Sequence, residues 1–125
     1  MKYASSEDRL NPLPPEDADE TTLGGYMAVH GRAAAFEAGD GQPYTVAVET
    51  DTAEDGDPER PVAGYLVFIR WAQTGTAIMG HLETGDLVHA RTEDEARALL
   101  EALPLREVRA LLDEAIARRR ALGGD

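Results

Sequence analysis

The side chains that could do chemistry are few, and they gather after the middle of this 125-residue chain. His81 and Glu83 are two positions apart, which places them on one face of a strand, as metal ligands often are. A three-residue loop over 84–86 would bring His89 opposite His81 and complete a possible site for a divalent metal. A two-residue loop over 85–86 would put His89 on the other face. We expect polar rim residues here, with no metal and no other cofactor.

Arg70 is the third ionisable side chain of this region. It could pair diagonally with Glu83, or it could bind an anionic ligand in a groove. Convergence of Arg70, His81 and Glu83 on an otherwise apolar face would line a pocket. One hypothesis is therefore a small-molecule-binding or enzymatic domain built around that pocket.

Recognisable catalytic motifs are missing from the sequence. The chain has no cysteine, so it can form no disulfide, thiolate metal site or cysteine nucleophile. It has no Gly-x-x-x-x-Gly-Lys phosphate loop. The acidic loop 51–60 resembles part of a calcium loop, but Ala53 and Val62 occupy positions that require oxygen ligands. The sequence thus leaves enzymatic activity uncertain and favours a protein that is not an enzyme.

The elements that must position these side chains begin with a predicted hairpin over 62–83. Aromatic and branched residues suit a strand, and Gly75 suits a two-residue turn with Thr74. That turn pairs Arg70 with Met79, Phe68 with His81 and Leu66 with Glu83. One face is expected to form the core, and it holds Val67, Ile69, Trp71, Ile78, Gly80 and Leu82. The opposite face holds Leu66, Phe68, Arg70, Met79, His81 and Glu83.

This second face is apolar with a charged end, so something besides solvent should cover it. The alternatives are the N-terminal residues Tyr3, Leu10 and Leu13, a sheet curled around a ligand, or a second copy of the chain. We favour the second copy, because two-fold homodimers are the commonest oligomers. The main functional hypothesis is a non-enzymatic interaction or accessory module. Its interface candidates are Leu66, Phe68, Arg70, Met79, His81 and Glu83.

The remaining pattern predicts an α+β fold. Strands are expected within 24–38, over 44–50 and over 87–90, which gives an antiparallel meander of four to five strands. Thr92 and Glu95 form a capping box for a helix over about 93–103, and Pro104 starts another over 104–121. Both helices should pack on one face of the sheet. Residues 1–23 read as an acidic, proline-containing tail, and 24–125 as a single domain.

The net charge of −12 bounds the possible partners. Six acids lie in the tail and six lie within 49–60. Such charge disfavours nucleic acids and anionic membranes, whose phosphates attract lysine and arginine. No apolar run approaches the roughly 20 residues of a membrane span, and the N-terminus turns polar at once. We therefore expect a cytoplasmic protein that binds itself or another protein.

Overall fold

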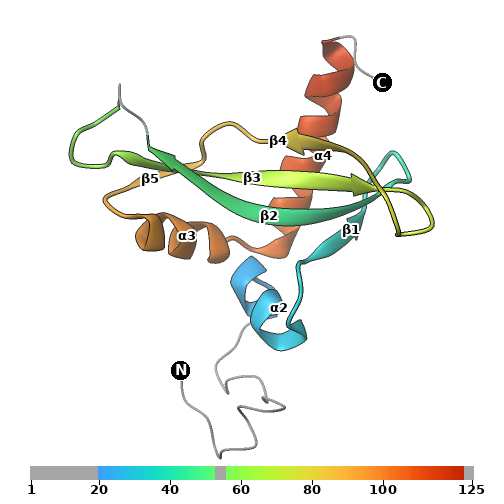
Figure 1. Ribbon diagram of the computed structural model, residues 1–125, viewed down its shortest axis with the longest axis horizontal. Coiled ribbons are helices and arrows are strands. Elements are labelled where there is room, and N and C mark those ends of the chain that lie inside the picture. Colours follow the sequence, from blue (N-terminus) through green and yellow to red (C-terminus); the bar gives the residue numbers. More distant parts are fainter. Residues whose placement is uncertain (1–19, 53–55, 123–125) are drawn as a thin grey trace, which may run out of the picture.

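The computed structural model describes residues 20–52 and 56–122. An antiparallel sheet is followed by two C-terminal helices, which confirms the predicted α+β class (Figure 1). The elements in chain order are α2 (Leu23–His30), β1 (Ala35–Glu37), β2 (Pro43–Thr52), β3 (Val62–Trp71), β4 (Ile78–Glu83), β5 (Val88–Ala90), α3 (Glu93–Glu101) and α4 (Leu105–Ala121). Both C-terminal helices were expected from their stripes and caps.

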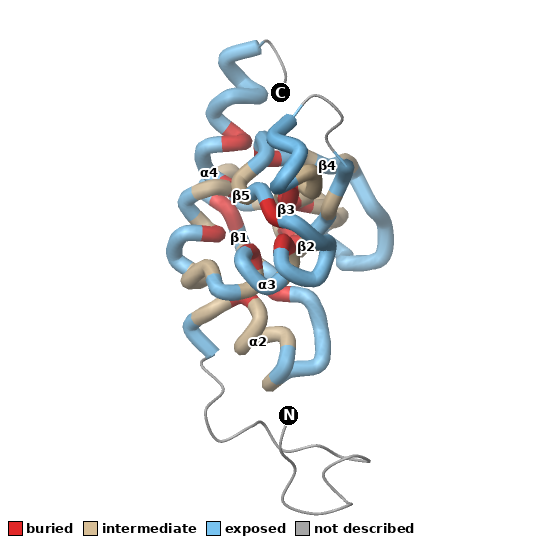
Figure 2. The backbone as a smooth tube through the Cα atoms, turned by 90° about the vertical axis from the view of Figure 1, so that its left-hand side faces the viewer, coloured by how far each residue is buried: buried red, intermediate tan, exposed pale blue. Residues whose placement is uncertain are grey.

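The sheet order is β1-β2-β3-β4, and β5 pairs with β3 as well. Figure 2 shows α2, α3 and α4 gathered on one side of strands β2, β3 and β4. The helices therefore cover one face, here called the inner face, and no helix of the described residues covers the opposite, outer face. Within the described residues, no helix is both long and apolar enough to cross a membrane.

Residues 23–30 form a helix, so the strand predicted from Gly24 onward is wrong for this stretch. The Thr22 side chain accepts a hydrogen bond from the Gly25 amide at 3.1 Å and caps the helix. Gly31 ends it with φ of 63°, a left-handed conformation that glycine adopts without strain. The strand was predicted from the alternation of residues 28–36. Most of these residues are glycine or alanine, which favour neither face of a sheet.

The start of α2 is tied to the junction between α3 and α4. The Leu23 amide donates to the Leu103 carbonyl at 2.8 Å, and the Leu105 amide donates to the Thr21 carbonyl at 2.6 Å. Leu23 has no exposed surface. The predicted tail therefore ends too late, since residues 20–23 belong to the folded body. Its residues 1–19, including Tyr3, Leu10 and Leu13, lie outside the described residues.

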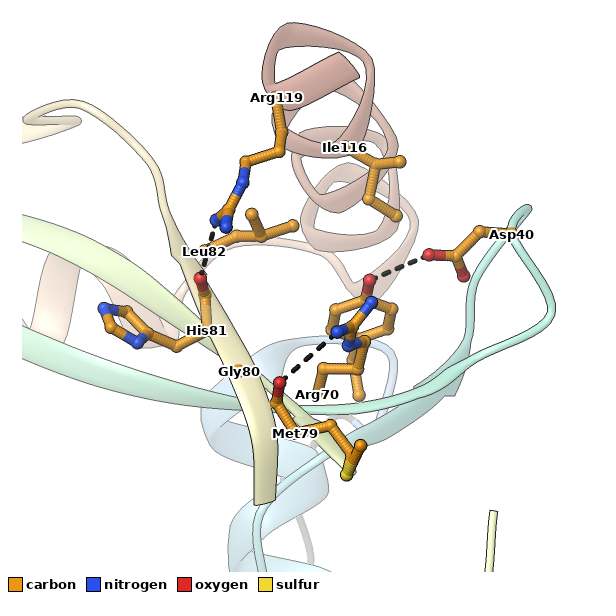
Figure 3. A pocket seen from close by; sticks show the side chains of 9 residues that line it. Asp40, Arg70, Met79, Gly80, His81, Leu82, Ile116 and Arg119 are labelled. Atoms are coloured by element: carbon orange, nitrogen blue, oxygen red, sulfur yellow. Dashed lines mark hydrogen bonds between the residues drawn. The ribbon is translucent and has the colours of Figure 1, made fainter. Parts of the chain in front are cut away.

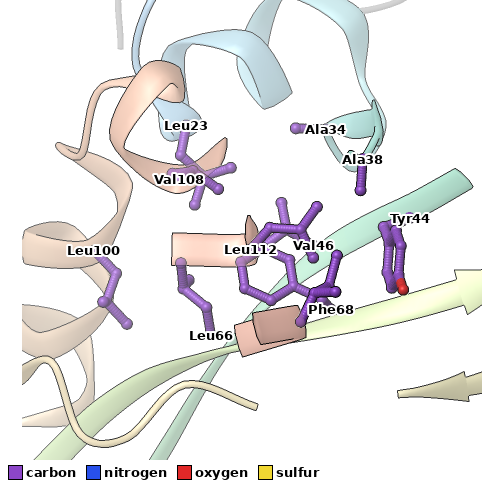
Figure 4. Packing of buried hydrophobic residues seen from close by; sticks show 11 residues of the cluster. Leu23, Ala34, Ala38, Tyr44, Val46, Leu66, Phe68, Leu100, Val108 and Leu112 are labelled. Carbon is purple, nitrogen blue, oxygen red and sulfur yellow. The ribbon is translucent and has the colours of Figure 1, made fainter. Parts of the chain in front are cut away.

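The core lies between the inner face of the sheet and the helices (Figure 4). Leu66 and Phe68 of β3 are fully buried there. Tyr44 and Val46 of β2 pair with Arg70 and Phe68, so they share this face. The alternation predicted for residues 44–50 is confirmed. The assignment of Leu66 and Phe68 to the uncovered face is wrong, since the helices cover this side.

A β-bulge also shifts the predicted register of the central hairpin. Trp71 pairs with Ile78 as expected, but beyond it Arg70 pairs with Gly80 and Phe68 pairs with Leu82. Met79 is the extra residue, and Gly80 follows with φ of 154°. An isolated glycine within a strand is typical of a bulge. As a result, the partners predicted for Arg70, Phe68 and Leu66 are each wrong by one position.

The sequence suggested that the chain turns back at residues 84–86, but in the structure it continues along β3. The Thr84 amide donates to the Leu66 carbonyl at 2.9 Å, and its hydroxyl accepts from the Leu66 amide at 3.0 Å. The Leu87 amide then donates to the Gly64 carbonyl at 2.8 Å. These bonds keep the chain on the edge of β3, where β5 follows β4 end to end.

Gly64 marks the closest approach of the helices to β3. A Cβ there would lie 2.7 Å from Val88 Cγ2 and 2.9 Å from Leu100 Cδ1. We expect Gly64→Ala to lower the free energy of unfolding by about 1–3 kcal/mol, because it overpacks the core. Gly85→Ala is the control, since nothing lies within 4 Å of its Cβ. Urea denaturation of both variants checks the prediction, and equal midpoints would contradict it.

Candidate functional site

The outer face of the sheet is apolar along its central strand. Cross-strand pairing places residues of β2, β3 and β4 on one surface, because paired residues share a face. That surface consists of Thr45, Ala47, Glu49, Tyr65, Val67, Ile69, Trp71, Ile78, His81 and Glu83. Its β3 members are half-buried. This is the face that the sequence analysis assigned to the core, whereas the described helices leave it open.

The most apolar part of the outer face lies around Trp71. The indole nitrogen of Trp71 donates to Thr45 Oγ1 at 2.9 Å, which fixes the ring across β2. Ile78, its partner on β4, is 62% exposed, and the bulge residue Met79 is 55% exposed. Large apolar side chains are therefore presented to the surroundings at this end.

The other end of the outer face is acidic. Tyr65 pairs with Glu49 of β2. Desolvation of the phenol raises the pKa of Tyr65, and so do the nearby charges of Glu83, Asp51 and Glu49. Along β3, Tyr65 and Trp71 are six residues apart, or about 20 Å. The face is thus apolar at one end and negatively charged at the other.

Of the three candidate metal ligands, His81 and Glu83 come together, but His89 lies far from them. His81 Nε2 lies 3.7 Å from Glu83 Oε2, and both side chains are exposed on the outer face. His89 pairs with Ala63 and His81 pairs with Ile69, so the two histidines lie about 20 Å apart along β3. Within residues 20–52 and 56–122, no three histidine, cysteine or acidic side chains are grouped to hold a metal ion.

Arg70 belongs to a separate site on the inner face. It lines a cavity of about 60 Å³ between β4 and α4, together with Asp40, Tyr44, Gly80 and Arg119. Arg70 Nη2 donates to the Met79 carbonyl at 3.3 Å. The predicted diagonal pair with Glu83 is therefore wrong, because the bulge places Glu83 on the outer face. Arg70 and His81 line this cavity, whereas Glu83 lines a second hollow together with His81 and Arg118, so within the described residues the cavity does not unite all three.

His81 touches this cavity through its backbone. Arg119 Nη1 donates to the His81 carbonyl at 3.4 Å, and the imidazole points away from the cavity (Figure 3). The cavity and the outer face therefore lie on opposite sides of β4. Each has to be judged by itself as a functional site.

Tyr44 and Asp40 form a hydrogen-bonded pair at the cavity. The Tyr44 hydroxyl donates to Asp40 Oδ2 at 2.8 Å, while Asp40 Oδ1 accepts from the Gln42 amide at 2.9 Å. Burial, the hydrogen bond to Asp40 and the carboxylate charge raise the pKa of Tyr44 to about 12, and the nearby charge of Arg70 opposes this. The hydroxyl thus stays protonated and holds the turn after β1.

This pKa predicts a loss of stability in alkali. Because the pKa of Tyr44 is about 12 in the fold against 10.0 for the free phenol, the unfolded chain loses its proton first. The contribution of Tyr44 is complete below pH 10 and disappears as the pH rises to 12. Urea midpoints between pH 9 and 12 should fall less steeply for Tyr44→Phe. An equally steep fall in that variant would contradict this assignment.

The Tyr44–Asp40 pair and the contact of Arg119 with β4 were not predicted from the sequence. Asp40 lies within a tight turn just before Tyr44, and an aspartate in a turn often bonds the backbone two residues on. The hydrogen bond of Asp40 could have been predicted from this pattern, but the approach of α4 to β4 could not, because it depends on tertiary packing.

Comparison of the chain with models of protein families, with curated proteins and with solved structures finds no match.

Proposed function

We propose that the protein is a non-enzymatic interaction module that forms a homodimer through the outer face of its sheet. The observation that carries the proposal is the apolar stripe Tyr65, Val67, Ile69 and Trp71, which the described helices do not cover. Antiparallel sheets with one solvated face normally alternate apolar and polar residues. Here the central strand is apolar on both sides, as in sheets that are covered twice.

The surroundings of the stripe resemble an interface. Recognition surfaces combine an apolar, aromatic centre with a polar rim. On the outer face, Ile69 and Trp71 belong to the central strand β3, while Glu49, His81 and Glu83 pair with β3 residues from the flanking strands. Ile78 is 62% exposed, and burial of such a large apolar side chain in an interface lowers the free energy.

The distribution of charge favours a second copy of the chain as the partner. Ile69 pairs with Thr45 and His81, and Trp71 pairs with Ile78, so neither of these two residues pairs directly with a carboxylate; Glu37 lies farther out, on the edge strand β1, where it pairs with Pro43. A two-fold axis near Trp71 would bring two apolar ends together. Glu49, the partner of Tyr65, would then lie about 20 Å from the axis, and Glu83, the partner of Val67, about 13 Å from it. Both distances exceed the screening length of about 8 Å, so these carboxylates oppose self-association only weakly.

The position of the contact can be tested with the only tryptophan in the chain, Trp71. The emission of Trp71 and the mass from light scattering should be followed on the same dilution series. We expect the emission to shift to longer wavelength as the mass falls from dimer to monomer, because the indole is then exposed to water. If the mass halves while the emission stays constant, the contact lies elsewhere and the proposed face is wrong.

A further inference from the structure

We propose that the cavity between β4 and α4 binds a small oxyanion, held by the guanidinium groups of Arg70 and Arg119. The proposal concerns the inner side of β4 and does not depend on the outer face. The ligand would be a free phosphate or a carboxylate, or the corresponding end of a larger molecule. Arginine suits both, because its planar fork of donors matches their oxygens.

The two arginines have donors to spare. Arg70 donates from one nitrogen to the Met79 carbonyl at 3.3 Å, and Arg119 donates from one nitrogen to the His81 carbonyl at 3.4 Å. Both bonds are long for a charged donor. A guanidinium has five N–H donors. The ion pairs within the described residues are His30–Glu20, His81–Glu83 and Arg109–Asp113, so neither cavity arginine is paired with a carboxylate there.

Asp40 also lines the cavity, but its oxygens are already engaged. One accepts from the Gln42 amide and the other from the Tyr44 hydroxyl. These bonds hold the carboxylate at the turn. The lining contains two arginines against this one carboxylate, so its charged side chains carry a net positive charge. Figure 3 shows the imidazole of His81 turned away, where it adds no charge to the cavity.

The space fits a group of this size. A cavity of about 60 Å³ has room for roughly four atoms the size of a water oxygen, comparable to the heavy atoms of a phosphate or carboxylate group. The bulge leaves room here, since Gly80 has no side chain and a Cβ would lie 3.8 Å from Arg70 Nη2. Leu82 and Ile116 form apolar walls, which strengthen the attraction between the ligand and the arginines.

Titration of the full-length protein followed by amide NMR tests the proposal. Sodium phosphate and sodium acetate are added separately at pH 7, with ionic strength held constant by sodium chloride. We expect saturable shifts of the Gly80 and His81 amides with a Kd in the millimolar range for at least one of the two anions. A response to phosphate alone identifies phosphate chemistry, and a response to acetate alone identifies a carboxylate.

Three matched variants separate a site from general attraction. Arg70→Gln and Arg119→Gln should each weaken binding at least tenfold. Arg118→Gln removes the same charge from the neighbouring position of α4, which does not line the cavity, and should change the Kd less than twofold. Arg119 is exposed, so its variant keeps the fold. Absence of saturable shifts with both anions, or equal weakening by Arg118→Gln, would overturn the proposal.

Discussion

Replacing Phe68 with alanine should lower the free energy of unfolding by about 3–5 kcal/mol. The ring has no exposed surface and packs in the cluster with Val46, Leu66 and Leu112. Its removal leaves a cavity that the surrounding side chains cannot fill. Since small domains are stable by about 5–15 kcal/mol, this variant should unfold at a much lower urea concentration.

Val67→Ala is the control for Phe68→Ala, because Val67 lies next to it on the same strand and points to the outer face. Its side chain is half-buried, so the expected loss is about 1 kcal/mol. The comparison decides which face of β3 forms the core of the monomer. A larger loss for Val67→Ala than for Phe68→Ala would mean that the sheet is covered on the opposite side.

Ile78→Asp should dissociate the proposed homodimer without unfolding the chain. Ile78 is 62% exposed in the monomer, so aspartate is tolerated there. In the dimer the carboxylate would be buried against apolar groups of the second copy, without a partner. Truncation of a central interface residue typically costs about 2 kcal/mol or more, so the Kd should rise at least about 30-fold. Sedimentation equilibrium measures this change.

Leu99→Asp provides the matched control for Ile78→Asp. Leu99 is 46% exposed on α3, on the helical side of the molecule, and the substitution adds the same charge. We expect its dimer to be as tight as that of the wild type. Equal weakening by the two substitutions would show that added charge, and not the outer face, governs self-association.

The C-terminal helices could be predicted because their signals are local. Thr92 accepts a hydrogen bond from the Glu95 amide at 3.1 Å, as the capping pattern indicated, and α4 begins directly after Pro104. α2 has comparable signals in Thr22 and Gly31 at its two ends. The prediction for this stretch rested on the alternation of its residues and did not include these caps.

The covered face of β3 could not be decided from its pattern. Leu66 and Phe68 on one side are as apolar as Val67 and Ile69 on the other, so periodicity gives no preference. In the structure, the absence of a side chain at Gly64 lets Ala96 and Leu100 of α3 approach β3, so α3 covers the face that holds Leu66 and Phe68. Which face of β3 is covered therefore depends on how the helices pack on the sheet, and this packing cannot be read from the strand pattern.

The candidate site was missed for a related reason. A one-residue change in register moves every following side chain to the other face. The bulge at Gly80 thereby separates Arg70 from His81 and Glu83, and the predicted pocket becomes an outer face and an inner cavity. A glycine inside a strand often marks a bulge, but the sequence does not show which residue of the strand is left unpaired.

Native mass spectrometry of the untagged wild-type protein tests the central claim most directly. The account predicts a species of twice the mass of one chain at micromolar concentration, and its loss in Ile78→Asp but not in Leu99→Asp. A wild-type protein that remains monomeric at every concentration would contradict the proposal that a second copy covers the outer face.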